Sequence, residues 1–182
     1  MTKTALILTT NGTEDMELII SSDVLRRGGI NVTIAGLHEQ PTVKLARDAI
    51  LQVDKAFKSV VGADFDAIVL PGGPGSDEFC KDGRVGEILK RHASAGKIVA
   101  AICAAPTALK AHNIAAGATV TAYPSVRDKL DGFYKFVEEK VVVDGNVVTS
   151  RGPGTAFDFA LKLVELLAGA DKAKEVRGQM LL

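Results

Sequence analysis

One segment predicts the architecture of this 182-residue chain: Lys97-Ile-Val-Ala-Ala-Ile-Cys103-Ala-Ala-Pro106-Thr-Ala-Leu109. Its apolar run predicts a buried strand at residues 98–102, and the small residues after Cys103 predict the start of a helix. A thiol at such a junction sits on a sharp turn, where unpaired N–H groups and the positive helix end favour thiolate over thiol. The position suits a nucleophile or an oxidation sensor, although a free cysteine can also be a plain core residue.

The rest of the chain repeats this alternation of short β-branched runs and helical segments. Strands are expected at residues 5–8, 31–35 and 67–70, short extended pieces within 44–53, and a hairpin of 135–143 with 146–150 around Asp144-Gly145. Helices are expected at residues 14–27, 54–61, 84–95, 155–167 and 172–180. The pattern predicts one doubly wound α/β domain over residues 1–182, with a mostly parallel sheet, helices on both faces and an added hairpin.

Composition narrows the classes of partner and compartment. Lys and Arg (22) balance Asp and Glu (22), so the chain lacks the broad charge of a nucleic-acid or anionic-membrane binder. No apolar stretch approaches a membrane span, and the N-terminus does not resemble a secretory signal. Two cysteines do not suggest a disulfide framework. We therefore expect a cytoplasmic protein, with nucleus and mitochondrion as further compartments.

Glu17 is the second candidate for chemistry. It shares a helix face with Ile20 and Val24, three and seven positions further on. A carboxyl on an apolar face is costly unless it is paired or protonated. The alternative is a surface glutamate at the edge of the apolar stripe. Glu14 and Asp15 are expected acids of a first helical turn and need no function.

A glycine-rich loop, Pro71-Gly72-Gly73-Pro74-Gly75, follows the strand at residues 67–70. Ligand sites in doubly wound folds lie at the carboxyl ends of the strands, where this loop and Cys103 meet. Glycines there let backbone N–H groups approach a ligand as an oxyanion hole, although an ordinary tight turn explains them equally.

Histidine is scarce: His92 and His112 are expected on solvent-facing helix positions, and neither they nor His38 sit beside Cys103. A Cys-His pair, as in cysteine proteases and glutaminases, is therefore hard to assemble. The histidines lack metal-ligand spacing, and Cys80, expected in a polar loop, is far from Cys103, so no metal or cofactor is predicted.

Several motifs together resemble the ThiJ/PfpI superfamily, and most of all its parkinsonism-associated protein deglycase (glutathione-independent glyoxalase) branch. The resemblance runs from about Lys3 to the C-terminus. It is carried by Gly12-Thr-Glu-Asp-Met-Glu17, Arg26-Arg27, Val32-Thr-Ile-Ala-Gly36, Ala46-Arg47-Asp48, Val69-Leu-Pro-Gly-Gly73, Ala100-Ala-Ile-Cys-Ala-Ala-Pro106 and Thr149-Ser-Arg-Gly-Pro-Gly-Thr155.

This resemblance implies a flavodoxin-like sandwich that forms a homodimer. It implies a reactive Cys103, a protonated Glu17 bonded to its sulfur, and backbone donors at Gly73 and Ala104, with Gly72 beside them. Arg27 and Arg47 are expected along an anion-binding pocket edge, and Pro153 and Tyr123 in the pocket wall. Family members often have a histidine where this chain has Tyr123, whose hydroxyl donates hydrogen bonds but is a poor base near neutrality.

Two functions follow from the resemblance, and both use the same residues. In the first, the chain converts methylglyoxal or glyoxal to the 2-hydroxy acid through a Cys103 hemithioacetal, with glycated proteins as a further substrate. In the second, Cys103 is a peroxide sensor oxidised to sulfinate, and the protein signals or acts as a chaperone in oxidative stress. A glutamine amidotransferase-like hydrolase is disfavoured because the thiol has no histidine base.

Overall fold

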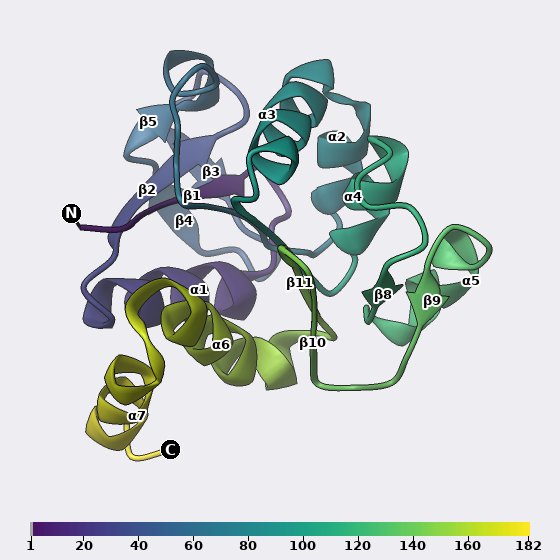
Figure 1. Ribbon diagram of the computed structural model, residues 1–182. Helices are drawn as coiled ribbons and strands as arrows, with labels where there is room; N and C mark the ends of the chain where they lie inside the picture. The colour runs from purple at the N-terminus through teal and green to yellow at the C-terminus, as the bar shows by residue number, and fades with distance from the viewer. Residues whose placement is uncertain (1) are drawn as a thin grey trace.

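The computed structural model describes residues 2–182 and is built around one central sheet (Figure 1). The strands of this sheet are β1 Thr4–Thr9, β2 Asn31–Gly36, β5 Lys55–Ala56, β6 Ala67–Leu70, β7 Ile98–Ile102, β10 Val141–Asp144 and β11 Val147–Ser150. Their spatial order is β10-β11-β7-β6-β1-β2-β5. All neighbours pair in parallel except β10 and β11, which form the antiparallel hairpin.

Two small two-stranded sheets and the helices complete the fold. The small sheets pair β3 Thr42–Lys44 with β4 Ile50–Gln52, and β8 Thr119–Val120 with β9 Lys135–Phe136. The helices are α1 Asp15–Arg27, α2 Ser76–Lys81, α3 Gly83–Ser94, α4 Pro106–Ala111, α5 Arg127–Leu130, α6 Ala156–Ala168 and α7 Ala170–Gln179. Short 3-10 turns lie at η1 Phe57–Ser59, η2 Pro124–Val126 and η3 Pro153–Thr155.

The sheet separates two hydrophobic cores. Side chains alternate along a strand, so Ile7 of β1 faces the helices α1 and α6, while Leu6 faces the opposite layer. Leu18 of α1 belongs to the first core, and Ile88 of α3 belongs to the second. Figure 1 shows the corresponding layers, with α1, α6 and α7 on one side and α2, α3 and α4 on the other. The predicted doubly wound α/β sandwich is thereby confirmed.

The topology brings three loops to one edge of the sheet. The parallel neighbours β1, β6 and β7 end at Thr9, Leu70 and Ile102, so the segments that follow them emerge side by side. Backbone bonds tie the first two segments together: the N–H of Glu14 donates to the carbonyl of Gly72 at 3.0 Å. The edge is therefore a rigid platform for the side chains that lie on it.

Three predictions about individual elements were wrong. Residues 54–61 are not a helix: they contain β5 and then η1, because Lys55 pairs with Ala35 and extends the sheet edge. Residues 135–143 are not one strand, since β9 leaves to pair with β8 before β10 begins. Cys80 lies in the helix α2 rather than in a loop. Among residues 2–182, no helix combines the length and apolarity needed to span a membrane.

Candidate active site at the carboxyl ends of the central strands

Cys103 occupies a strained turn directly after β7. Its φ is +65°, the left-handed region that costs an L-residue roughly 1–2 kcal/mol. Neighbouring backbone holds it there: its N–H donates to the carbonyl of Ser150 at 3.0 Å, and its own carbonyl accepts from the N–H of Tyr123 at 2.8 Å. Strain that the surroundings enforce in this way is typical of functional residues. The helix α4 begins three residues later, at Pro106.

Glu17 lies in the first turn of α1 and is fully buried. Its Oε2 accepts a hydrogen bond from the N–H of Gly72 at 2.7 Å. The Cys103 thiol lies within hydrogen-bonding reach of the same carboxyl, while Oε1 has no partner of standard geometry within residues 2–182. A buried carboxyl with one unsatisfied oxygen beside a sulfur atom is well placed to carry a proton and to donate it.

Burial is the main influence on both titrating groups. It raises the pKa of Glu17 to about 7, although the hydrogen bond from the Gly72 N–H lowers this pKa. Burial also raises the pKa of Cys103 to about 12, and the Glu17 charge adds to the effect. The expected thiolate is therefore not favoured by the turn alone. A proton on Glu17 removes the carboxylate charge that raises the pKa of Cys103, so the thiolate forms more readily beside the protonated acid. The two groups therefore titrate as a coupled pair.

One backbone N–H group of the glycine loop and one of the turn after Cys103 are directed at the sulfur. The N–H groups of Gly73 and Ala104 hydrogen-bond Cys103 and lower the pKa of its thiol, opposing burial. Gly72 has another role than the one expected, because its N–H is directed at Glu17. A Cβ on Gly72 would lie 2.7 Å from Cys103 Cβ and 2.9 Å from the Ala104 nitrogen, so only glycine fits there.

Glu14 also belongs to the site, although it was expected only as an acid of the first helical turn without a function. It is the N-cap of α1, and its Oε2 accepts from the N–H of Glu17 at 2.8 Å. Its charge further raises the pKa of Glu17. The sequence signal for this role is an acid three residues before Glu17 at the start of a helix. An acid in that position can accept a hydrogen bond from an unpaired N–H of the first turn.

A cavity of about 450 Å³ opens over Cys103. It is lined by Glu14, Ala46, Arg47, Gly73, Pro74, Ser76, Asp77, Cys103, Ala104, Thr107, Tyr123, Ser125, Val126, Lys129 and Pro153. Of the predicted pocket residues, Arg47, Tyr123 and Pro153 line this cavity. Arg27 does not, because it lies in the last turn of α1 and pairs with Asp23 at 2.8 Å. Ser125 and Lys129 also line the cavity, and no motif in the sequence pointed to either of them.

The histidines lie outside this cavity. His92 is buried rather than solvent-facing: its Nε2 accepts from the N–H of Phe65 at 3.0 Å, and its Nδ1 faces the carbonyl of Ile88 at 2.7 Å. His112 bonds the carbonyl of Phe79, and His38 pairs with Glu78. Among residues 2–182, no group of three or more His, Cys, Asp or Glu side chains could hold a metal ion.

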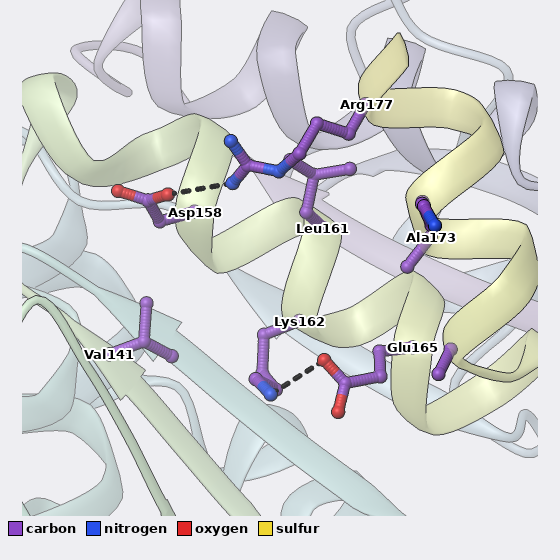
Figure 2. A pocket seen from close by; sticks show the side chains of 9 residues that line it. Val141, Asp158, Leu161, Lys162, Glu165, Ala173 and Arg177 are labelled. Atoms are coloured by element: carbon purple, nitrogen blue, oxygen red, sulfur yellow. Dashed lines mark hydrogen bonds and ion pairs between the residues drawn. The ribbon is translucent and has the colours of Figure 1, made fainter. Parts of the chain in front are cut away.

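A second cavity, of about 380 Å³, lies between α6, α7 and β10 (Figure 2). Charged side chains on its walls pair with one another, Arg177 with Asp158 at 3.2 Å and Lys162 with Glu165 at 2.6 Å. Its lining contains neither a thiol nor a hydroxyl group. The cavity over Cys103 is therefore the candidate active site.

A buried thiol on a turn between strand and helix, beside a buried carboxyl and a glycine loop, places this chain among α/β proteins that carry a cysteine at this junction. Comparison with known proteins names the class: residues 3–166 match the DJ-1/PfpI family, and the chain belongs to this family. Protein dj-1beta of Drosophila melanogaster is 47% identical over 100% of this chain and 98% of its own. The crystal structure of Drosophila melanogaster DJ-1beta superposes with a TM-score of 0.98, covering 100% of this chain and 99% of the other. The glutathione-independent glyoxalase DJR-1.2 of Caenorhabditis elegans is 44% identical over 96% of this chain and 94% of its own.

Proposed function

We propose that this protein is a cofactor-independent glyoxalase that converts methylglyoxal or glyoxal to the 2-hydroxy acid at Cys103. One observation carries the proposal: the thiol lies beside a buried carboxyl whose pKa is about 7, with the N–H groups of Gly73 and Ala104 directed at the sulfur. The glyoxalase name of the Caenorhabditis elegans relative supports the same substrate class.

The first step is addition of sulfur to the aldehyde. The reactive form of the pair is a Cys103 thiolate beside protonated Glu17. The sulfur forms a bond to the aldehyde carbon, and the aldehyde oxygen takes the proton of Glu17, which gives a hemithioacetal. The N–H groups of Gly73 and Ala104 stabilise the charge that develops on this oxygen during the attack.

Glu17 then moves two protons, because a carboxyl with a pKa near 7 both accepts and donates at neutral pH. It takes the proton of the former aldehyde carbon and delivers it to the ketone oxygen, which gives an enediol. It next takes the proton of the hemithioacetal hydroxyl and delivers it to the adjacent carbon, which gives a thioester. Water cleaves the thioester, releases the 2-hydroxy acid and returns its remaining proton to Glu17. In sum, one dicarbonyl and one water give one 2-hydroxy acid, and no oxidant or reductant is needed.

The test is lactate formation from methylglyoxal by the wild type and three variants. Cys103→Ser and Glu17→Ala are expected to lose at least about a hundredfold in rate, since each removes a group that the steps require. Cys80→Ser is the matched control, because the Cys80 sulfur lies in α2, 3.5 Å from Thr107 Oγ1, outside the cavity lining. Undiminished turnover by Cys103→Ser would overturn the proposal.

A second function, oxidation sensing, is favoured by the same donors. Sulfinate carries two oxygens, and the N–H groups of Gly73 and Ala104, together with protonated Glu17, are hydrogen-bond donors around the sulfur. Mass spectrometry after mild peroxide is expected to find two added oxygens on Cys103 before Cys80. The reverse order would exclude this role, and with it a signalling or chaperone response to that oxidation.

Assembly and cellular location complete the proposal. α1 exposes Met16 and Ile19 at 48% and 45%, and an apolar helix face of this kind fits a homodimer interface. Light scattering of the purified protein is expected to give twice the monomer mass. We further propose glycated proteins as a second substrate and a cytoplasmic location extending to nucleus or mitochondrion. A deglycation assay corrected for loss of free methylglyoxal tests the former, and fractionation of cells tests the latter.

A further inference from the structure

The cavity over Cys103 is larger than the smallest 2-oxoaldehydes require. Its volume of about 450 Å³ falls in the range of roughly 300–1,000 Å³ that is typical of pockets for drug-sized ligands. Glyoxal has only four heavy atoms, so most of the cavity stays unfilled when its carbonyl is at the sulfur. What lines the remaining space decides which substituent on the aldehyde is bound best.

Tyr123 supplies the aromatic ring of this lining, and we call Tyr123, Val126 and Pro153 together the aromatic wall. Its backbone is held on both sides: its N–H donates to the Cys103 carbonyl at 2.8 Å, and its own carbonyl accepts from the N–H of Val126 at 3.0 Å. The backbone of Tyr123 is therefore held in place relative to Cys103.

The ring of Tyr123 rests on a glycine. A Cβ built on Gly152 would lie 3.3 Å from Cδ2 and 3.7 Å from Cε2 of the ring, which is contact distance. With its edge supported by this backbone, the residue is still 46% exposed. A rigid aromatic ring that is only half covered by protein retains surface on which an apolar or aromatic group can pack.

We propose that Tyr123 is a specificity-determining residue that makes the site prefer 2-oxoaldehydes with an aromatic or bulky apolar substituent over glyoxal. The inference rests on the proposed glyoxalase function and adds its substrate preference. Tyr123 acts through the face of its ring and not through its hydroxyl, so it takes no part in the proton transfers of Glu17. Phenylglyoxal, which carries the same reactive group as methylglyoxal and an aromatic ring, is the diagnostic substrate.

The experiment compares kcat/KM for phenylglyoxal and glyoxal in the wild type, Tyr123→Phe and Tyr123→Ala. The wild type is expected to favour phenylglyoxal by about tenfold or more, the discrimination that an apolar pocket gives to a well-fitting group. Tyr123→Phe keeps the preference. Tyr123→Ala loses most of it through a higher KM for phenylglyoxal, so the ratio of the two kcat/KM values falls toward one. Thermal melts of each variant verify that it is folded.

Gly152→Ala is a second probe that leaves Tyr123 in place. Its added methyl group meets the ring at 3.3 Å, so it is expected to displace the ring and alter the substrate ratio while preserving glyoxal turnover. Equal ratios in the wild type and Tyr123→Ala, or loss of the preference in Tyr123→Phe, would overturn the inference and leave the glyoxalase function standing. Absence of turnover of every 2-oxoaldehyde by the wild type would instead overturn the proposed function together with the inference.

Discussion

The N–H of Gly72 donates a 2.7 Å hydrogen bond to Oε2 of Glu17 and so fixes one oxygen of a fully buried carboxyl. The other oxygen, Oε1, has no hydrogen-bond partner of standard geometry among residues 2–182, and the Cys103 thiol lies within reach of the same carboxyl. The glycine loop thus orients the carboxyl through Gly72 and donates to Cys103 through Gly73. Each half of the proposed catalytic pair depends on the same short segment of backbone.

Glu17 is expected to make stability depend on pH. Its pKa is about 7 in the folded protein against 4.5 as the ordinary value, so the folded state binds the proton more tightly. The stabilisation is therefore complete below pH 4.5 and is lost as pH rises through 7, by an amount on the order of 3 kcal/mol. Urea unfolding of the wild type and Glu17→Gln at several pH values is the measurement. The difference between the two is expected to grow from pH 4.5 to 7 and then level off; a constant difference would contradict the assignment.

Gly72→Ala is expected to lower the free energy of unfolding by about 1–3 kcal/mol, since its Cβ overlaps the Cys103 Cβ at 2.7 Å. It should also slow alkylation of Cys103 by moving the loop. Gly62→Ala is the matched control, because nothing lies within 4 Å of the added Cβ. Chemical denaturation that gave the two variants equal stability would show that the close contact is absent.

His92 is expected to destabilise the fold in acid. Burial lowers its pKa below the ordinary value of 6.5, although the hydrogen bond to the Ile88 carbonyl raises it. A lowered folded pKa means that the unfolded chain takes the proton first, so stability is retained above pH 6.5 and falls as pH drops below it. Protonation also breaks the bond that His92 Nε2 accepts from Phe65. In thermal melts, His92→Gln should lose the part of the acid destabilisation that comes from His92. His38→Gln, altered at an exposed position, should keep it.

Arg47 and Arg27 are expected to differ in their effect on the anionic product. Arg47 lines the cavity, and its N–H is tied to Asp15 at 2.8 Å, whereas Arg27 pairs with Asp23 outside the cavity lining. Arg47→Ala should weaken inhibition by lactate by about fivefold, the effect of one partly exposed charge. Arg27→Ala should leave the inhibition constant as in the wild type. Equal effects of the two variants would contradict this placement.

Much of the architecture follows from local sequence patterns. β6 and β7 have the expected bounds because continuous apolar runs between turn residues have few alternatives. The sequence also identified Glu17 as anomalous, since a carboxyl on an apolar helix face requires an explanation. Such features depend on residues a few positions apart, and they can be recognised without tertiary structure.

Other features depend on contacts between distant segments and could not be predicted. His92 has the helical spacing of a surface residue, but Phe65, 27 positions away, supplies the N–H that makes its burial tolerable. The different surroundings of Arg27 and Arg47 likewise follow from tertiary structure. Arg27 lies at the end of α1, whereas the loop after β3 brings Arg47 back to the start of α1. The pKa of Cys103 is the clearest case, because burial outweighs the backbone donors that the turn provides.

The most direct test of the proposed mechanism is the position of deuterium in lactate formed from methylglyoxal in D2O, read by ¹H NMR. Glu17 carries exchangeable protons, so we expect solvent deuterium at the carbon that bears the hydroxyl group, and loss of lactate formation in Cys103→Ser. Lactate that retains the original aldehyde hydrogen at that carbon would contradict the proton transfers assigned to Glu17, because in them this carbon receives the proton of the hemithioacetal hydroxyl.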